Sequence, residues 1–189
     1  MNKSQNFEFK SLITCEEYEL LLKKMPKGNS DKQTNHYFDT EVFSLKANDI
    51  SIRVREREDF SLTYKKKKGY TNDVKTLEID KDQFEAMRES GEIGIPDIDS
   101  RISHYVKGDK LINFLSLSTF RTYIPYEGGV LYIDKTSYFG ITDYEIGFSC
   151  NTYQSGKKTF IDLIKKYDLK YQKAPKKIKR AYEAYKTIM

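Results

Sequence analysis

Hydrophobic and polar residues alternate along several short stretches of this chain, which predicts β-strands because successive side chains point to opposite faces. Residues 5–10 show the pattern first: Phe7 and Phe9 share one face, and Glu8 and Lys10 share the other. The same alternation predicts further strands at residues 35–40, 51–56, 61–65, 76–79, 111–126, 129–138 and 141–150. The pattern therefore indicates about eight strands in all.

Apolar residues at helical spacing predict helices before, between and after these strands. Thr14 and Glu17 form a capping box at the start of the first helix. The other predicted helices follow Asp80, run over about 96–106, carry the apolar stripe from Phe160 to Tyr167, and begin at Pro175. Residues 29–34 are predicted to form a polar loop and residues 45–49 a turn-rich connection.

Two architectures explain strands with one apolar and one charged face. A sheet with one face in water explains them as well as a barrel does. The amphipathic helices favour the barrel, because they need an apolar sheet face to cover and thereby turn the charged face inward. We therefore predict an α+β protein: an eight-stranded antiparallel β-barrel, or tunnel, with helices outside and a single domain over residues 1–189.

Composition narrows the class of protein. Charged residues make up 32% of the 189 residues, and the formal net charge of +5 suits an anionic partner. No run of about 18 apolar residues is present, so no membrane-spanning helix is expected. The start of the chain lacks the apolar core of a signal peptide. Cys15 and Cys150 lack metal-ligand spacing and are interpreted as reduced thiols, so we predict a cytoplasmic protein.

The charged strand faces carry the candidate chemistry. The bases are Lys10, Arg53, Arg55, Lys65 and Arg121, and the acids are Glu8, Glu78, Asp134 and Glu145. Charges that face an interior must be paired or must bind ions. Clustered Arg and Lys side chains are suited to a polyphosphate. Carboxylates at one side are suited to Mg²⁺ or Mn²⁺, because both ions prefer oxygen ligands.

The order of these motifs resembles one known family. They are Glu8-Phe9-Lys10, Arg53-Val54-Arg55, Leu62-Thr63-Tyr64-Lys65, Leu77-Glu78, Arg121, Leu131-Tyr132-Ile133-Asp134 and Asp143-Tyr144-Glu145. Together they resemble the CYTH family, also called triphosphate tunnel metalloenzymes, whose members include thiamine triphosphatase-like proteins. Residues 35–40 are similar to a strand signature of its small Firmicutes-type members, and residues 177–180 to its closing Lys-Ile-x-Arg element.

The resemblance implies a tunnel that binds triphosphate. Family members hydrolyse inorganic triphosphate, thiamine triphosphate or nucleoside triphosphates, and some are class IV adenylate cyclases. By the same resemblance, phosphate would be bound by Lys10, Arg53, Arg55, Lys65, Arg121 and Arg180, metal by Glu8, Asp134 and Glu145, and the catalytic residues would be Glu78 and Lys177. The implied cofactor is Mg²⁺ or Mn²⁺, and the implied activity is a metal-dependent triphosphatase.

Two positions depart from the family pattern. Asn6 and Gly147 stand where the family has glutamates, and both belong to the metal end. Fewer anionic oxygens bind a divalent metal more weakly, so we expect slow turnover. The combined change Asn6→Glu and Gly147→Glu is accordingly predicted to raise metal affinity and the rate of triphosphate hydrolysis.

Other functions stay open at this point. One alternative is a binding module for a polyphosphate or nucleotide with little or no turnover, and a further one is an adenylate cyclase. The Lys65–Lys68 run beside Tyr64 and Tyr70 is typical of some nucleic-acid surfaces. We interpret it instead as a solvated hairpin, so the expected partner is a small molecule that bears a triphosphate. The oligomeric state is left open.

Overall fold

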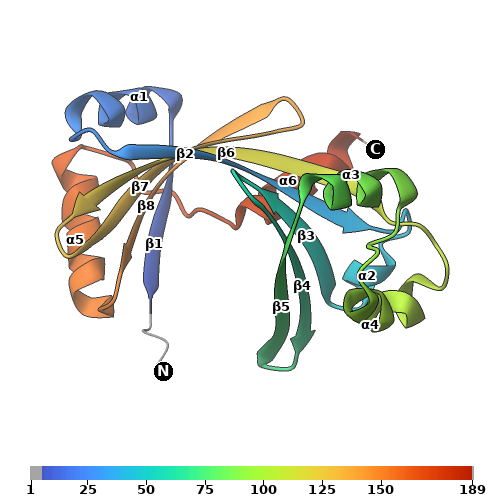
Figure 1. Cartoon of the computed structure of the whole chain (residues 1–189). Coiled ribbons are helices and arrows are strands. Elements are labelled where there is room, and N and C mark those ends of the chain that lie inside the picture. The colour runs from blue at the N-terminus through green and yellow to red at the C-terminus, as the bar shows by residue number, and fades with distance from the viewer. Residues whose placement is uncertain (1–5, 189) are drawn as a thin grey trace. The chain divides into compact units, whose positions relative to one another are not determined.

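The computed structural model describes residues 6–188, which form strands β1–β8 and helices α1–α6 (Figure 1). The strands are β1 (Phe7–Ile13), β2 (Asn29–Asp39), β3 (Ile50–Glu56), β4 (Phe60–Lys68), β5 (Thr71–Ile79), β6 (Ile112–Tyr126), β7 (Gly129–Tyr138) and β8 (Ile141–Cys150). The helices are α1 (Cys15–Lys24), α2 (Ser44–Ala47), α3 (Lys81–Ser90), α4 (Pro96–Val106), α5 (Tyr153–Lys166) and α6 (Lys177–Ile188). Residues 1–5 lie outside the described part. They include the first residue of the predicted first strand and most of the N-terminal segment in which a signal peptide was not expected.

The strands form one eight-stranded sheet in the order β1-β8-β7-β6-β2-β3-β4-β5. Each strand pair whose register is described is antiparallel. The predicted α+β class, with eight antiparallel strands and accompanying helices, is therefore confirmed. No helix within residues 6–188 is long and apolar enough to cross a bilayer.

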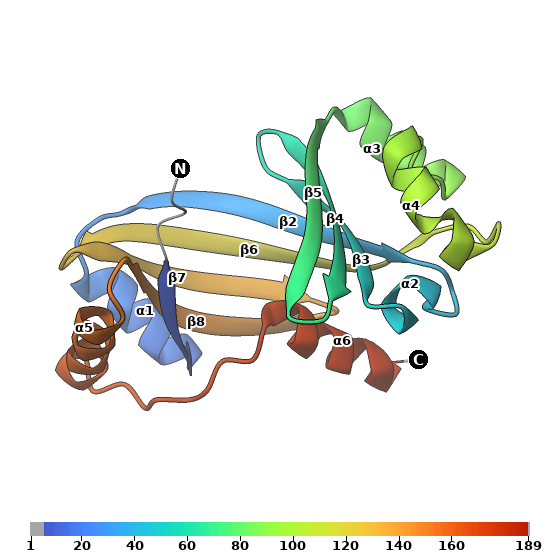
Figure 2. The ribbon, with the colours of Figure 1, turned by 90° about the horizontal axis from the view of Figure 1, so that it is seen from below.

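The chain divides into two compact units, which we describe separately. The first unit consists of residues 1–32 and 118–189, and the second of residues 33–117. In the first unit, α1 and α5 lie against β8, and α5 also contacts β1 (Figure 2). Their apolar side chains pack on the apolar strand face in a core that includes Leu21, Leu131, Ile133, Ile146, Phe148, Phe160 and Leu163. The charged face of these strands is thus the face that α1 and α5 leave uncovered.

The second unit repeats this arrangement. Phe84 and Met87 of α3 are buried in a core with Ile52 and Val54 of β3 and Leu62 of β4. Side chains of α4 belong to the same core. As in the first unit, the apolar face of the strands lies under helices, as the alternation predicts.

Two local predictions are wrong. Residues 29–34, predicted as a loop, form the first half of β2, and residues 44–47 form the short helix α2. The first half of β2 is polar on both faces, so hydrophobic alternation cannot reveal it. Sheet neighbours hold it instead: the Ser30 and Thr122 hydroxyl oxygens lie 3.0 Å apart. Gly28 precedes this segment because any side chain there would collide with the carbonyl oxygen of Tyr123.

Asp39, the last residue of β2, organises the start of α2. Its Oδ1 accepts hydrogen bonds from the backbone N–H groups of Thr40 (2.8 Å) and Leu45 (2.9 Å), and its Oδ2 accepts one from Lys46 (2.9 Å). The residue is only 3% exposed. Asp39 therefore satisfies backbone donors that water does not reach.

Replacing this carboxylate should destabilise the chain. We expect Asp39→Ala to lower the free energy of unfolding by about 3 kcal/mol, because buried backbone donors lose a charged acceptor. Urea unfolding followed by circular dichroism measures the change. Glu41→Ala is the matched control: the side chain is exposed and close in sequence, and its loss should cost less than about 0.5 kcal/mol. Equal stabilities of the two variants would contradict the assigned role.

Candidate functional site

Strand register brings charged side chains of the first unit together. Arg121 of β6 is directly opposite Asp134 of β7, and Asp134 is directly opposite Glu145 of β8. Directly opposed residues of antiparallel strands point to the same face. The three residues therefore form one charged row across the sheet, on the face opposite the apolar core.

Asp134 lies at the centre of this row and is fully buried. The Arg121 guanidinium donates to both of its carboxylate oxygens, from Nε to Oδ1 and from Nη2 to Oδ2, each at 2.7 Å. The Lys177 ammonium donates to Oδ2, also at 2.7 Å. Burial alone would raise the pKa of Asp134, but the hydrogen bonds and charges of Arg121 and Lys177 outweigh burial and lower it. Asp134 is therefore a carboxylate held in its charged form by two cations.

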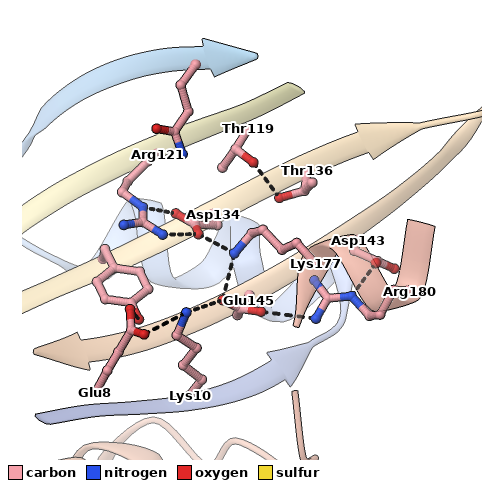
Figure 3. A network of polar contacts seen from close by, with 12 residues as sticks. Glu8, Lys10, Thr119, Arg121, Asp134, Thr136, Asp143, Glu145, Lys177 and Arg180 are labelled. Carbon is pink, nitrogen blue, oxygen red and sulfur yellow. Dashed lines mark hydrogen bonds and ion pairs between the residues drawn. The ribbon is translucent and has the colours of Figure 1, made fainter. Parts of the chain in front are cut away.

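Glu145 shares the same ammonium group. Lys177 Nζ lies 2.7 Å from Glu145 Oε1, so one lysine at the start of α6 bridges two buried acids (Figure 3). Lys10 Nζ lies 3.6 Å from the same oxygen. Arg180 Nη1 donates to Glu145 Oε2 at 3.1 Å. Each oxygen of Glu145 thus contacts at least one protein cation.

Arg180 continues the network to Asp143 of β8. Its Nε donates to Asp143 Oδ2 at 2.8 Å. The Tyr138 hydroxyl donates to the same oxygen at 2.5 Å, and burial together with this bond raises the pKa of Tyr138 to about 12. Arg180 Nη2 is buried and has no hydrogen-bond partner in the described part of the chain. Arg180 therefore keeps one buried donor available for an additional acceptor.

Glu8 and Lys10 extend the site to β1. Lys10 Nζ lies 3.0 Å from Glu8 Oε2, and the Tyr132 hydroxyl donates a short hydrogen bond to Glu8 Oε1. Burial tends to raise the pKa of Glu8, but the Tyr132 hydrogen bond and the Lys10 charge outweigh it, and the pKa is lowered. Asn6 lies at the exposed end, where its Oδ1 accepts a hydrogen bond from Ser149 at 2.8 Å. The amide of Asn6 is thus engaged by β8.

A cavity of about 290 Å³ adjoins these residues. Its lining includes Glu8, Lys10, Glu145 and Lys177 from the network. Lys173 and Lys176 add two further positive charges, and the remaining lining residues, Tyr171, Ala174 and Pro175, are uncharged. Lysines therefore outnumber glutamates around the cavity, an electrostatic environment that favours an anion.

The second unit has its own charged face, carried by β3, β4 and β5. Register aligns Arg53 with Thr63, and Arg55 with Ser61 and Glu78. Arg53 Nη2 donates to Thr63 at 3.3 Å, while its Nε is buried and lacks a partner among the described residues. A guanidinium whose buried Nε lacks an acceptor is suited to an incoming anion.

The remaining predicted residues of this unit lie on the same face. Register aligns Lys65 with Ser51 and Val74, the row next to the one that contains Arg53. Lys65 and Glu78 are exposed, and neither forms an ion pair within the described part of the chain. Arg55 donates from Nε to the buried Asn35 at 3.3 Å.

The lysine run at the end of β4 is largely engaged within the protein. Lys66 Nζ donates to the Tyr105 hydroxyl at 2.5 Å, and Lys68 Nζ lies 3.1 Å from an Asp73 oxygen. These residues belong to a regular strand of the β4–β5 hairpin. This supports the interpretation of the run as a hairpin rather than as a nucleic-acid surface.

The carboxylates of the first unit fit a divalent cation in two ways. Their oxygens are suitable ligands, and one position lies close to an oxygen of both Asp134 and Glu145. Asp134 and Glu145 place an oxygen of each carboxylate at 2.7 Å from a single position, which the Lys177 ammonium holds. Carboxylate oxygens are the ligands that Mg²⁺ and Mn²⁺ prefer. Within residues 6–188, no group of three or more His, Cys, Asp or Glu side chains is arranged so that it could hold a metal ion. A metal at this point would therefore take the place of the ammonium.

The network contains two residues of the quoted sequence motifs to which no role was assigned from the sequence. Asp143 shares the site face with Glu145, and Tyr132 shares it with Asp134, so strand parity was a sufficient signal for both. Tyr132 is 2% exposed, and its ring lies under the Arg121 guanidinium, with the guanidinium carbon 4.0 Å from the ring centroid. A tyrosine between leucine and isoleucine is easily taken for core. Its ring instead belongs to the charged face.

These observations define the class of protein: an α+β protein whose antiparallel strands carry clustered arginines, lysines and carboxylates on the face opposite the apolar core. Comparison with known proteins then identifies the family. Residues 4–182 match the model of the CYTH domain. The chain therefore belongs to the CYTH domain family, and the resemblance noted in the sequence is confirmed.

Individual relatives span the whole chain. "Putative triphosphatase YjbK" of Bacillus subtilis is 28% identical over 97% of this chain and 97% of its own length. A crystal structure described as a "putative adenylate cyclase" from Bacillus halodurans is 28% identical, with a TM-score of 0.72 over 95% of this chain and 98% of that one. HpAC1 of Hippeastrum, for which a dominant triphosphatase activity is described, shares the fold at 18% identity and a TM-score of 0.72, over 97% of this chain and 96% of its own.

Proposed function

We propose that this protein binds a triphosphate-bearing small molecule and hydrolyses a terminal phosphoanhydride bond with Mg²⁺ or Mn²⁺. Membership of the CYTH family and the similarity to the Bacillus subtilis protein support this activity class. The observation that carries the proposal is the pair of buried carboxylates of Asp134 and Glu145, which share one cation position amid Lys10, Arg121 and Arg180. Buried acids and bases arranged in this way suit a metal polyphosphate.

Each predicted residue has a role in this function. Phosphate oxygens are bound by Lys10, Arg121 and Arg180 in the first unit and by Arg53, Arg55 and Lys65 in the second. Glu8, Asp134 and Glu145 hold the metal, which neutralises phosphate charge when it is bound. Lys177 leaves the carboxylates for phosphate oxygens, and Glu78 orients a base or a second metal. We propose that the family domain spans residues 1–189, forms a closed tunnel, and works in the cytoplasm.

The chain's own side chains supply most of the expected catalysis. Water attacks the terminal phosphorus, and negative charge is spread over the phosphoryl oxygens during the transfer. Guanidinium and ammonium groups placed beforehand around these oxygens stabilise that charge without reorganisation. The buried Arg180 Nη2 and Arg53 Nε, which have no described partner, are donors available for this purpose.

Phosphate release from inorganic triphosphate tests the proposal. We expect release with Mg²⁺ or Mn²⁺ and a loss of at least about 100-fold in Arg121→Ala, which removes a bidentate cation from the site. Arg88→Ala is a matched control, because Arg88 pairs with Glu85 on the surface of α3. No release above background with either metal at neutral and alkaline pH would overturn the hydrolase. Release of pyrophosphate and cyclic AMP from ATP would instead indicate a cyclase.

A binding module with little or no turnover is the second candidate. The observation that favours it is the metal end, where Asn6 and Gly147 supply no carboxylate and each oxygen of Glu145 already contacts a cation. This candidate predicts that triphosphate raises the melting temperature without any metal. Stabilisation by triphosphate without phosphate release in the preceding assay would support it over the hydrolase.

A further inference from the structure

Gly147 and Tyr132 form a pair across β7 and β8. The register places them directly opposite each other, and Lys10 of β1 is directly opposite Gly147 on its other side. Neighbouring strands lie about 4.8 Å apart, so β7 and β1 are separated by roughly twice that distance. A side chain on β7 therefore reaches β1 only if nothing on β8 stands between them.

Gly147 provides this space. A Cβ atom at position 147 would collide with ring atoms Cζ and Cε2 and with the hydroxyl oxygen of Tyr132. The ring thus lies across β8, and its hydroxyl donates to Glu8 on β1. The ring is 2% exposed, and its face also supports the Arg121 guanidinium. One aromatic side chain consequently links a proposed metal ligand to a proposed phosphate ligand.

We propose that Tyr132 is a positioning residue of the metal end, and that it performs this role only because residue 147 is glycine. Glu8 lies near the sheet edge, and its side chain is 45% exposed. Tyr132 fixes Oε1 and Lys10 fixes Oε2, so the carboxylate is oriented at both oxygens. Each oxygen retains a second lone pair for a metal. The inference rests on the proposed function and adds a residue that orients the metal ligand from outside the ligand set.

The position of the Tyr132 ring changes the effect expected of Gly147→Glu. A glutamate at this position does not simply add a carboxylate to the metal end, because its first side-chain atom would occupy the place of the Tyr132 ring. We expect Gly147→Glu alone to lower stability and to weaken metal binding. A glutamate at position 147 should contribute a ligand only when residue 132 is small, as in Tyr132→Val combined with Gly147→Glu.

The first test distinguishes the effect of the Tyr132 hydroxyl on metal binding from the effect of its ring. Mn²⁺ binding is measured by electron paramagnetic resonance in the presence of a non-hydrolysable imido analogue of triphosphate. Tyr132→Phe keeps the ring on Gly147 and under Arg121 but loses the donor to Glu8. We expect Mn²⁺ affinity to fall about 10-fold, the scale typical of lost partners of metal ligands, with affinity for the analogue nearly unchanged. Tyr144→Phe is the control, because Tyr144 packs against α1 on the opposite face.

A double-mutant cycle between positions 132 and 147 tests whether the Tyr132 ring needs the space that Gly147 leaves. Tyr132→Val, Gly147→Glu and the double variant are compared by urea unfolding and by Mn²⁺ affinity. We expect the double variant to be more stable than the sum of the single changes predicts, and to bind Mn²⁺ at least 10-fold more tightly than Tyr132→Val.

The outcomes distinguish this inference from the proposed function. If the wild type binds both Mn²⁺ and the analogue, but Tyr132→Phe binds Mn²⁺ equally well or the cycle is additive, the positioning role is overturned and the proposed function stands. If the wild type binds neither ligand, the proposed function fails and the positioning role fails with it. Weaker Mn²⁺ binding in Tyr132→Phe together with coupling in the cycle supports both.

Discussion

Lys177→Met should raise the affinity of the protein for Mn²⁺ about 10- to 100-fold when no triphosphate is present. In the wild type the Lys177 ammonium occupies the point that Asp134 and Glu145 share, at 2.7 Å from an oxygen of each. A metal must displace this ammonium, and hydrogen bonds to charged groups contribute about 1.5–3 kcal/mol each. Methionine has a similar length and no charge, so it removes the competitor and leaves both acids in place.

The same change should weaken triphosphate binding. Lys177 is expected to move onto phosphate oxygens when the ligand enters, and its loss removes one charge-assisted contact. In the wild type, metal and triphosphate should therefore bind with positive coupling, because the ligand withdraws the cation that blocks the metal. Lys177→Met should abolish most of this coupling.

Titration calorimetry with Mn²⁺ alone, imidotriphosphate alone and both together measures the coupling. Lys179→Met is the matched control, because Lys179 is exposed on the same helix. Unchanged Mn²⁺ affinity in Lys177→Met would mean that the ammonium does not compete with metal. Equal changes in Lys177→Met and Lys179→Met would indicate only the loss of a general positive charge.

Strand alternation was sufficient to predict most of the fold. The two faces of β1, β3, β4, β7 and β8 were assigned from parity alone, and the apolar faces lie under helices in both units. Alternation failed at residues 29–34 because this half of β2 lacks an apolar face. There the strand depends on its sheet neighbours, which are distant in sequence.

The candidate site was predicted as a set of residues but not as a set of contacts. Charge and parity selected Asp134, Glu145 and Arg121, but they could not show that Lys177 of α6 bridges the two acids, because that contact depends on where the last helix lies. The Tyr132–Gly147 pair was missed for a different reason. Gly147 was interpreted as a lost carboxylate, whereas the space that a glycine leaves becomes informative only when the neighbouring strand shows what fills it.

Asp134→Ala should produce the largest loss of stability among the site residues. The Asp134 carboxylate is fully buried between Arg121 and Lys177, whose side chains are only 19% and 16% exposed. Removing it leaves two poorly solvated cations next to each other. We expect the free energy of unfolding at pH 7 to fall by about 3–5 kcal/mol, the range found when one partner of a buried ion pair is removed. Asp162→Ala, which breaks the exposed pair with Lys158, should cost less than about 1 kcal/mol.

The dependence of this difference on pH provides an independent check. Because Arg121 and Lys177 lower the pKa of Asp134 in the folded state in spite of its burial, the charged carboxylate stabilises the fold above its unfolded pKa of about 3.9. That contribution is lost as the pH falls through the lower, folded pKa. The stability difference between wild type and Asp134→Ala should therefore be constant near neutrality and should shrink below about pH 4. A difference that stays constant down to pH 2 in urea unfolding would mean that Asp134 acts through packing rather than through its charge.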